Sequence, residues 1–397
     1  MPHPSARLST RRRVALTALL ALVVLGVAPA ANATPRTTPR QPAQPTSFKI
    51  YVGVVHLKGA TVADPLSDAS IKSEFANLSS FLSRETGLAI TASVVDIHRL
   101  EVPSTCDWSR LSEVDAIVQQ SFGDALRFAD DTKLVVYHDG PCSGGNGGGV
   151  AGLGGIDLVA HSGVLAHEFG HTLGRGHAGV YNCQAVAGAA GGPWDDDSKV
   201  CRATEYGDMW DFVGQNYPTY VTPLSRYMFG WLSPSQYQVV DSTYSGMIGL
   251  VPFSGTATGK QVILVTDPAG GADIVVEQRP AGPEGFSGYP AGVYVTRAAG
   301  HTSTLVTPAD QGTTTLATPL ALGQTYRSAG GAVRVTVEQV SSTGAQVRVE
   351  RANQAFVGVD WPNSLLGAWV STLRESCWGP GGRAGGCPGA VWRSGAG

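Results

Sequence analysis

Three features that commonly mark a function are missing from this sequence of 397 residues. It contains no two cysteines spaced as C-x-x-C, no G-x-S-x-G segment and, beyond residue 33, no apolar run long enough to cross a membrane. These absences argue against a thiolate zinc site, a serine nucleophile on a tight strand-to-helix turn, and a membrane span in the main body of the chain. Beyond residue 33 basic residues form no tract or face, so nucleic acid is not an expected partner.

The first 33 residues have the pattern of an export signal. Three arginines at positions 11–13 precede the apolar run "VALTALLALVVLGVA", and Ala31–Ala33 fits a small-x-small cleavage site. We therefore predict a signal peptide over residues 1–33 and a secreted, extracellular protein. A membrane anchor is the alternative, but the run is short and Pro29 follows it. Twin-arginine export is also open, although the residues after the arginines match it poorly. Cleavage would lower the formal charge from −3 to −7.

The six cysteines of an exported chain are most simply interpreted as three disulfides. Fifteen connectivities are possible, and the sequence does not choose among them. Their positions favour three local pairs, namely Cys106 with Cys142, Cys183 with Cys201, and Cys377 with Cys387.

Hydrophobic patterning divides the chain into two folded parts. Residues 34–47 are rich in proline and threonine and predict a linker. Residues 48–236 begin with alternating elements that indicate an open α/β layer with right-handed crossovers. The expected elements are a strand at 48–57, a helix at 70–87, a strand at 88–100, a helix at 112–129 and a strand at 133–139.

The second part, residues 237–351, alternates apolar and polar residues between turn signals. This pattern predicts an antiparallel β-sandwich or jelly-roll-like domain, so that the whole chain belongs to the α+β class. Residues 180–220, before it, are glycine-rich and are expected to be irregular, and the tail at 352–397 has no period. The clearest strand patterns lie at 261–267, 273–280, 292–298, 332–340 and 345–351.

A glycine tract at 144–155 contains G-x-G-x-x-G at Gly147, Gly149 and Gly152. A dinucleotide site would need a helix that opens on these glycines and an acidic residue after the next strand. The following residues supply more glycine and "IDLVAHS" instead, so this interpretation is rejected.

The segment "HEFGHTLGRGH" at 167–177 contains three of the nine histidines. Residues 162–173 are expected to be a helix, with Ser162 as its N-cap and Gly174 at its end. His167 and His171 are four residues apart and therefore project from one helix face, where both imidazoles can reach one Zn²⁺. Glu168 is turned aside from the metal but can take a proton from a water bound to it.

His177 decides the type of site. It lies too far round a continuing helix to reach the same metal, but glycine at position 174 permits a left-handed turn that redirects the chain. His177 would then be the third ligand and would leave the fourth position to water. The pattern H-E-x-x-H-x-x-G-x-x-H therefore predicts one catalytic zinc ion held by His167, His171 and His177.

This motif resembles that of the metzincin zinc metalloproteases. Other segments are most similar to the gametolysin-type family and its bacterial secreted relatives: "ATEYGDMWDFVG" at 203–214 resembles the Met-turn segment, and "LSRYMFGWLSP" at 224–234 resembles the helix after it. Residues 275–295 resemble the β-domain that follows the catalytic domain. The resemblance covers residues 48–350, and it implies a catalytic domain with a twisted mixed sheet and an active-site helix, followed by the β-domain.

The resemblance also implies roles for residues outside the zinc motif. Register places the Met-turn methionine at Val213; either Val213 forms the apolar floor, or the turn is shifted so that Met209 lies under the zinc. Methionine there packs and does not ligate, so valine affects rigidity more than chemistry. The segment 147–155 lies where metzincins carry the edge strand that pairs with substrate. The residues expected on that edge are Gly149, Val150, Ala151 and Gly152.

A few further polar residues have a structural and a functional interpretation. Tyr206 and Tyr217 are phenols near the motif that could polarise a carbonyl, although packing is the simpler role. The acidic run Asp195–Asp197 is either a solvated loop or a Ca²⁺ site. His161 could support the metal ligands, whereas His56, His98, His138 and His301 lie within or beside expected strands and are interpreted as structural.

Two hypotheses about function follow. The first is a secreted zinc endopeptidase that hydrolyses protein or peptide substrates, with Glu168 as general base on a zinc-bound water and with the substrate added as a strand at the glycine-rich edge. The second is a secreted protein whose β-domain binds glycan or cell wall and whose metal site is vestigial. The intact Glu168 argues against the second, because a vestigial site has no reason to keep its base.

Overall fold

The computed structural model describes residues 43–58, 66–103, 111–138, 149–152, 155–159, 164–185, 194, 199–214, 219–240, 244–266, 272–282, 289–307 and 317–351. Within this part, the chain is a mixed α+β protein with three sheets and few helices. None of the helices found there is long and apolar enough to cross a membrane. Several sequence predictions lie outside the described residues: the signal peptide at 1–33, most of the linker, the tail at 352–397, His161, Tyr217 and Asp195–Asp197.

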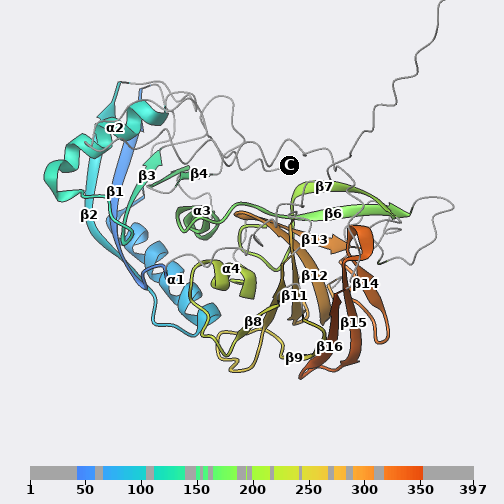
Figure 1. Ribbon diagram of the computed structural model, residues 1–397. Coiled ribbons are helices and arrows are strands. Elements are labelled where there is room, and N and C mark those ends of the chain that lie inside the picture. The colour runs from blue at the N-terminus through green and yellow to red at the C-terminus, as the bar shows by residue number, and fades with distance from the viewer. Residues whose placement is uncertain are drawn as a thin grey trace, which may run out of the picture. The chain divides into compact units, whose positions relative to one another are not determined.

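The N-terminal layer is a five-stranded sheet in the order β2-β1-β3-β5-β4 (Figure 1). β1, β2, β3 and β5 are parallel, whereas the edge strand β4 is antiparallel to β5. The strands expected at 48–57, 88–100 and 133–139 are confirmed. The five strands are β1 (Ser47–Leu57), β2 (Thr91–Val102), β3 (Thr132–His138), β4 (Gly149–Gly152) and β5 (Gly155–Val159).

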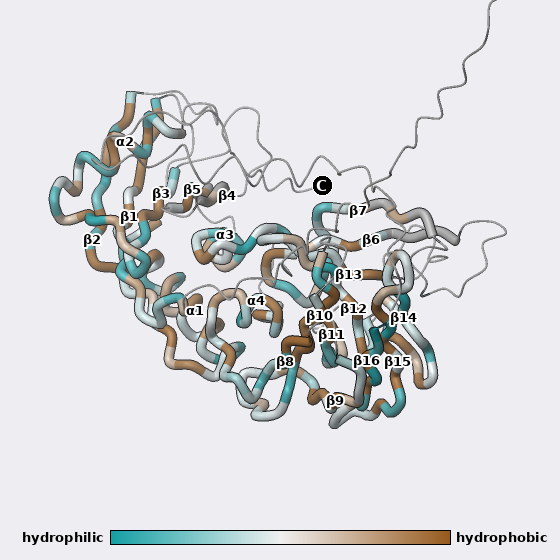
Figure 2. The backbone as a smooth tube through the Cα atoms, viewed as in Figure 1, coloured by the Kyte–Doolittle hydropathy of each residue, from teal (hydrophilic) through white to brown (hydrophobic). Residues whose placement is uncertain are grey.

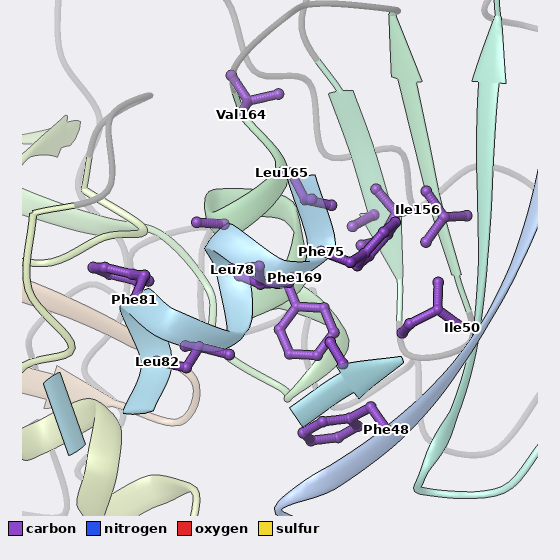
Figure 3. Packing of buried hydrophobic residues seen from close by; sticks show 14 of the residues in the cluster. Phe48, Ile50, Phe75, Leu78, Phe81, Leu82, Ile156, Val164, Leu165 and Phe169 are labelled. Carbon is purple, nitrogen blue, oxygen red and sulfur yellow. The ribbon is translucent and has the colours of Figure 1, made fainter. Parts of the chain in front are cut away.

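Helix α1 (Asp68–Thr86) covers one face of this sheet. The Ser67 side chain accepts a hydrogen bond from the Ser70 amide at 3.1 Å, and Gly87 ends the helix in a left-handed conformation with φ 70°. Apolar residues recur at helical spacing and face the sheet. The buried ones are Ile71, Phe75, Leu78, Phe81 and Leu82, most of which Figure 3 shows beside Phe48, Ile50 and Phe169.

Helix α2 (Leu111–Phe122) covers the opposite face of the sheet. Side chains alternate along β1, so this strand contributes residues to a core on each face. Phe48 and Ile50 belong to the core beneath α1, whereas Tyr51 and Val55 belong to the core beneath α2. The helix predicted at 112–129 is therefore present but shorter. Gly123 has φ 54°, a left-handed conformation that ends the helix. A 3₁₀ turn (Gly123–Ala125) follows, and residues 126–129 are not helical.

The other two sheets pack face to face and are formed mainly by residues 237–351. The larger sheet has seven strands in the order β7-β6-β13-β12-β11-β10-β8, and the smaller has four in the order β14-β15-β16-β9. In Figure 2 brown and teal alternate along β15 and β16, as expected for strands with one buried face. The strands are β6 (Ala178–Ala185), β7 (Lys199–Gly207), β8 (Tyr237–Val240), β9 (Gly246–Leu250), β10 (Val262–Val265), β11 (Asp273–Arg279), β12 (Gly292–Ala299), β13 (Thr302–Thr307), β14 (Thr325–Arg327), β15 (Val333–Val340) and β16 (Ala345–Arg351).

The central strands β10 and β11 of the seven-stranded sheet are buried on both faces. Ile263 and Val265 of β10 belong to the core shared with the four-stranded sheet, whereas Val262 and Leu264 contact the core around α4 (Pro223–Met228). The sandwich is thus present, but its larger sheet is mixed, because β10 is parallel to β8 and β13 is parallel to β6.

Strands β6 and β7 lie in a stretch that was expected to be irregular. β6 begins one residue after His177, pairs antiparallel with β7 and joins the β-sheet by pairing in parallel with β13. The predicted boundary between residues 236 and 237 therefore does not separate two sheets. In the same ladder Cys183 and Cys201 are directly opposite each other, a placement that suits the predicted disulfide. That pairing stays a prediction.

A buried ion-pair network fixes the segment that follows β7. Arg279 of β11 donates to Asp208 Oδ1 at 2.6 Å and lies 2.9 Å from Glu277 Oε2. The other oxygen of Glu277 accepts from the backbone amide of Leu224 at 3.0 Å, at the start of α4. One arginine of the β-sheet thereby holds both the Met-turn-like segment and the helix after it.

Candidate metal centre

Helix α3 (Leu165–Thr172) positions the first part of the zinc motif. The helix begins three residues later than predicted: its N-cap residue is Val164, which has no capping side chain, so the assignment of Ser162 as N-cap is wrong. The ring of Phe169 packs edge-on against Phe48 at 5.1 Å between centroids (Figure 3). At the other end, buried Lys133 donates to the Thr172 carbonyl at 3.1 Å and so satisfies a free carbonyl of the last turn.

The three predicted histidine ligands converge and are buried. Gly174 has φ 88°, a left-handed conformation that glycine adopts without strain, and the chain turns there as expected. His167, His171 and His177 each present a ring nitrogen, and these three atoms lie within 4.8 Å of one another. The Nε2 atoms of His167 and His171 are 3.1 Å apart.

Outer hydrogen bonds orient two of these imidazoles. His171 Nδ1 donates to the Arg175 carbonyl at 2.7 Å, and His177 Nδ1 donates to Glu205 Oε1 at 2.7 Å. Both bonds leave Nε2 with its lone pair turned toward the other rings, as is usual for metal-bound histidine. Burial, together with the neighbouring His167 and His177, holds the pKa of His171 well below its usual range. His171 is therefore in the neutral form that binds metal.

The donor set fits a zinc ion. Two nitrogens of a tetrahedral zinc site, each about 2.0–2.1 Å from the metal, are roughly 3.3 Å apart. The observed separation of 3.1 Å between the two Nε2 atoms is close to that value. Three imidazoles, grouped without a cysteine or carboxylate among the described residues, are also the donor set of catalytic zinc sites that keep one open position.

Glu168 lies directly beneath the edge strand β4. It is buried, and a Cβ atom added at Gly149 would come within 2.6 Å of Glu168 Cγ and 2.9 Å of its carboxyl carbon. The position can therefore hold only glycine while Glu168 keeps its place. Gly149, Val150, Ala151 and Gly152 all belong to β4, so the expected edge strand is present and passes over the expected base.

A pair of carboxyl groups, the buried Asp157 and the half-buried Asp115, lies behind this edge. Asp157 of β5 is opposite Val150 in the ladder and is hydrogen-bonded to Asp115 of α2. Burial, then Asp115 and Glu168, raises the pKa of Asp157 well above its usual range, and burial raises the pKa of Asp115 to about 6. Burial thus favours one proton shared by this pair, mainly on Asp157, over two ionised carboxylates.

Replacing Asp157 by asparagine is expected to raise the melting temperature at pH 8 by roughly a few degrees. The folded wild type keeps a proton that the unfolded chain releases above pH 3.8, so its stability falls as the pH rises toward the raised folded pKa. The asparagine amide can still donate to Asp115 but does not titrate. The difference should shrink toward pH 4, which thermal unfolding at both values will measure.

Asp131→Asn is the matched control for this prediction. Lys49 pairs with Asp131 at 3.1 Å and lowers the pKa of that carboxyl, so its removal should not stabilise the protein at pH 8. A difference between Asp157→Asn and wild type that does not change with pH would contradict the shared-proton assignment.

The two Met-turn candidates occupy different places. Val213 is fully buried in the core that contains Phe169, and a Cβ added at Gly170 would come within 2.5 Å of Val213 Cγ1. Val213 thus packs against α3 between the two helical ligands. Met209 packs against a separate cluster that contains Trp210 and Tyr294. Of the two, Val213 has the position expected of the apolar floor.

Tyr206 lies against the third ligand. Its hydroxyl donates to His177 Nε2 at 3.0 Å, and the two ring centroids are 4.2 Å apart. Burial, followed by Glu205 and Glu168, raises the pKa of this phenol, so it remains protonated and is a donor at neutral pH. The other phenol considered from the sequence, Tyr217, is outside the described residues.

Sequence reasoning missed three residues of this site. Glu205 lies in the "EYGD" segment, Arg175 lies inside the zinc motif, and Asp157 lies on the strand before it. A carboxylate beside a predicted ligand segment is a usable signal for Glu205, because ligand histidines commonly donate to carboxylates. Nothing in the local pattern indicates the other two, because their partners are far away in the sequence.

Comparison with known proteins adds no family. No family model matches the chain, and no curated protein matches it. A solved structure described as "Structure of a chaperone-substrate complex" is similar over 45% of this chain and 33% of its own, with 18% identity and a TM-score of 0.28. This chain thus spans about a third of that one, and so slight a likeness has no bearing on function. Function must be inferred from the residues of the site.

Proposed function

We propose that this protein is a secreted zinc-dependent endopeptidase of the metzincin type, most similar to the gametolysin-type family. The observation that carries the proposal is the convergence of three buried imidazoles next to Glu168, directly beneath an antiparallel edge strand. Each of these parts has a separate task in peptide-bond hydrolysis. Their order in the chain is also the order that the resemblance implies.

Strand β4 supports binding of an extended peptide. Among the strands that the structure describes, β4 lies at the end of its sheet beside β5, which is where a substrate strand can extend the ladder. Backbone pairing needs no particular substrate side chains, which suits an endopeptidase that acts on protein or peptide substrates. Because Gly149 lies against Glu168, a peptide paired with β4 would pass beside the carboxylate.

Three histidines would hold the metal, and Glu168 would move the proton. When bound by His167, His171 and His177, a zinc ion supplies Lewis acidity that polarises the scissile carbonyl and acidifies the attacking water. Glu168 accepts the proton of that water and delivers it to the leaving amine. Glu205 would keep His177 in its ligand orientation. The Tyr206 hydroxyl donates to His177 Nε2 in this structure, and with that nitrogen bound to zinc it would instead donate to an oxygen that gains charge on the substrate.

Metal removal tests this proposal. The purified protein should contain close to one zinc per chain and should cleave casein or gelatin. A chelator should abolish cleavage, because the three histidines supply the site's metal donors among the described residues, and added zinc should restore it. Cleavage that persists in protein shown to be free of metal would contradict the proposal. An inert, zinc-loaded protein that binds glycan or cell wall would support the alternative instead.

A further inference from the structure

The short loop that carries the third histidine is attached to the β-sheet of the second part of the chain. We call residues 174–177, between α3 and β6, the ligand loop. The Gly176 amide donates to the His301 carbonyl at 2.8 Å, and the Ser303 amide donates to the His177 carbonyl at 3.3 Å. From Ala178 onward the chain continues as β6, paired with β13. The position of His177 is therefore set by a strand about 125 residues later in the sequence.

Arg175, within the ligand loop, forms the other half of this attachment. Its side chain is fully buried, and each nitrogen of the guanidinium has a partner. Nη1 donates to the His301 carbonyl at 2.7 Å, Nη2 donates to Ser303 Oγ at 2.9 Å and to Asp211 Oδ2 at 3.0 Å, and Nε donates to Ser225 Oγ at 2.9 Å. One side chain thus joins the ligand loop to β13, to the segment under α3 and to α4.

The backbone of Arg175 contacts a ligand directly. Its carbonyl accepts the hydrogen bond from His171 Nδ1. The partner of the guanidinium, Asp211, also accepts at Oδ1 from the Val213 amide at 3.1 Å, and so fixes the residue that packs beneath the helix. Displacement of Arg175 would therefore disturb His171 through the Arg175 carbonyl and His177 through the ligand loop. It would also disturb Val213, the residue beneath the helix, through Asp211.

We infer that Arg175 is a positioning residue for the metal centre, and that β13 is the element that receives it. The β-sheet of the second part of the chain is then a structural component of the metal site. This inference rests on the proposed function, because it requires His167, His171 and His177 to bind zinc. Loss of outer-shell partners typically weakens metal binding by about 10–100-fold, and that is the effect expected here.

The test measures zinc affinity in the full-length mature protein by competition with a chromophoric chelator. Arg175→Met removes every donor but keeps apolar length, Arg175→Lys keeps the charge, and Ser303→Ala removes one acceptor on β13. The matched control is Arg348→Met, which breaks an exposed arginine–carboxylate pair with Glu338. The absorption spectrum of the Co²⁺-substituted protein reports ligand geometry, and thermal unfolding of the metal-free protein reports general stability.

Arg175→Met is expected to raise the zinc dissociation constant by about 10–100-fold and to shift the cobalt spectrum. Arg175→Lys and Ser303→Ala should weaken binding less, and Arg348→Met should match wild type. Wild-type affinity and spectrum in Arg175→Met would overturn the inference. If that variant does not fold, unchanged affinity in both milder variants would overturn it. Absence of zinc binding by wild type would overturn the proposed function and this inference together, whereas wild-type binding with unaffected variants would overturn the inference alone.

Discussion

Glu168→Gln is expected to lower the rate of casein or peptide hydrolysis by about 10²–10⁴-fold or more, which is the usual contribution of a general acid–base group. Glutamine has the size and polarity of glutamate but cannot accept the proton of the attacking water. The side chain lies against Gly149 and carries no metal in the proposed site, so the substituted residue should fit the same space. Zinc content and melting temperature should therefore remain close to wild type. Initial rates on one peptide, with zinc analysis of each sample, measure both effects.

A matched control for this variant is Glu338→Gln. It makes the same chemical change in an exposed ion pair between Glu338 of β15 and Arg348 of β16. Neither residue belongs to the proposed metal site, so hydrolysis should be unchanged. A Glu168→Gln protein that cleaves at the wild-type rate would rule out Glu168 as the base. Equal inactivity of wild type and Glu168→Gln on every peptide, combined with equal binding of glycan, would favour the binding-protein hypothesis.

His177→Ala is expected to weaken zinc binding by more than about 100-fold, because loss of a ligand should exceed the loss of an outer partner. Two helical histidines would remain, and the donor set would fall below the three protein ligands of catalytic zinc sites. The ring of His177 also forms hydrogen bonds with Tyr206 and Glu205, so each of these side chains would lose a partner that positions it. Equilibrium dialysis against zinc, with the retained metal counted per chain, measures the loss.

The control for this variant is His98→Ala. His98 lies on β2, where its Nδ1 is hydrogen-bonded to Ser121 Oγ at 3.0 Å and its ring stacks on Phe122 with the centroids 4.0 Å apart. Its loss should therefore affect packing but not metal content. Full zinc retention by His177→Ala would disprove the three-histidine assignment.

Acid should release zinc from wild type only below pH 6.5, the ordinary histidine pKa being about 6.5, because the pKa of His171 is lowered in the folded protein.

The spacing of the zinc motif was sufficient to predict that His167, His171 and His177 come together. A helix places residues four apart on one face, and glycine permits the left-handed turn that brings back the third histidine, so both rules act over a few residues. Period-two alternation likewise predicted β10, β11, β12, β15 and β16 to within about two residues, but it did not indicate β8, β9, β13 or β14. These features depend on local geometry, which the sequence encodes directly.

Hydrophobic patterning did not indicate β6 and β7, because glycine-rich segments lack the alternation that marks a strand. β6 pairs with β13, which lies more than 100 residues later in the sequence, and β7 pairs with β6. The choice between Val213 and Met209 was of the same kind: the motif allowed either, and only the packing of Gly170 against Val213 places one of them under the helix.

The sequence by itself determined which residues can bind the metal and which can act as base, since that chemistry depends on residue type and near-neighbour spacing. Only the tertiary structure decided what holds them in place: the carboxylate on His177, the carbonyl on His171, and the buried Arg175–Asp211 pair that joins the ligand loop to β13. The physical reason is burial. A charged or polar group removed from water must find a partner wherever the fold brings one, and for Arg175 those partners lie 36 to 128 residues away.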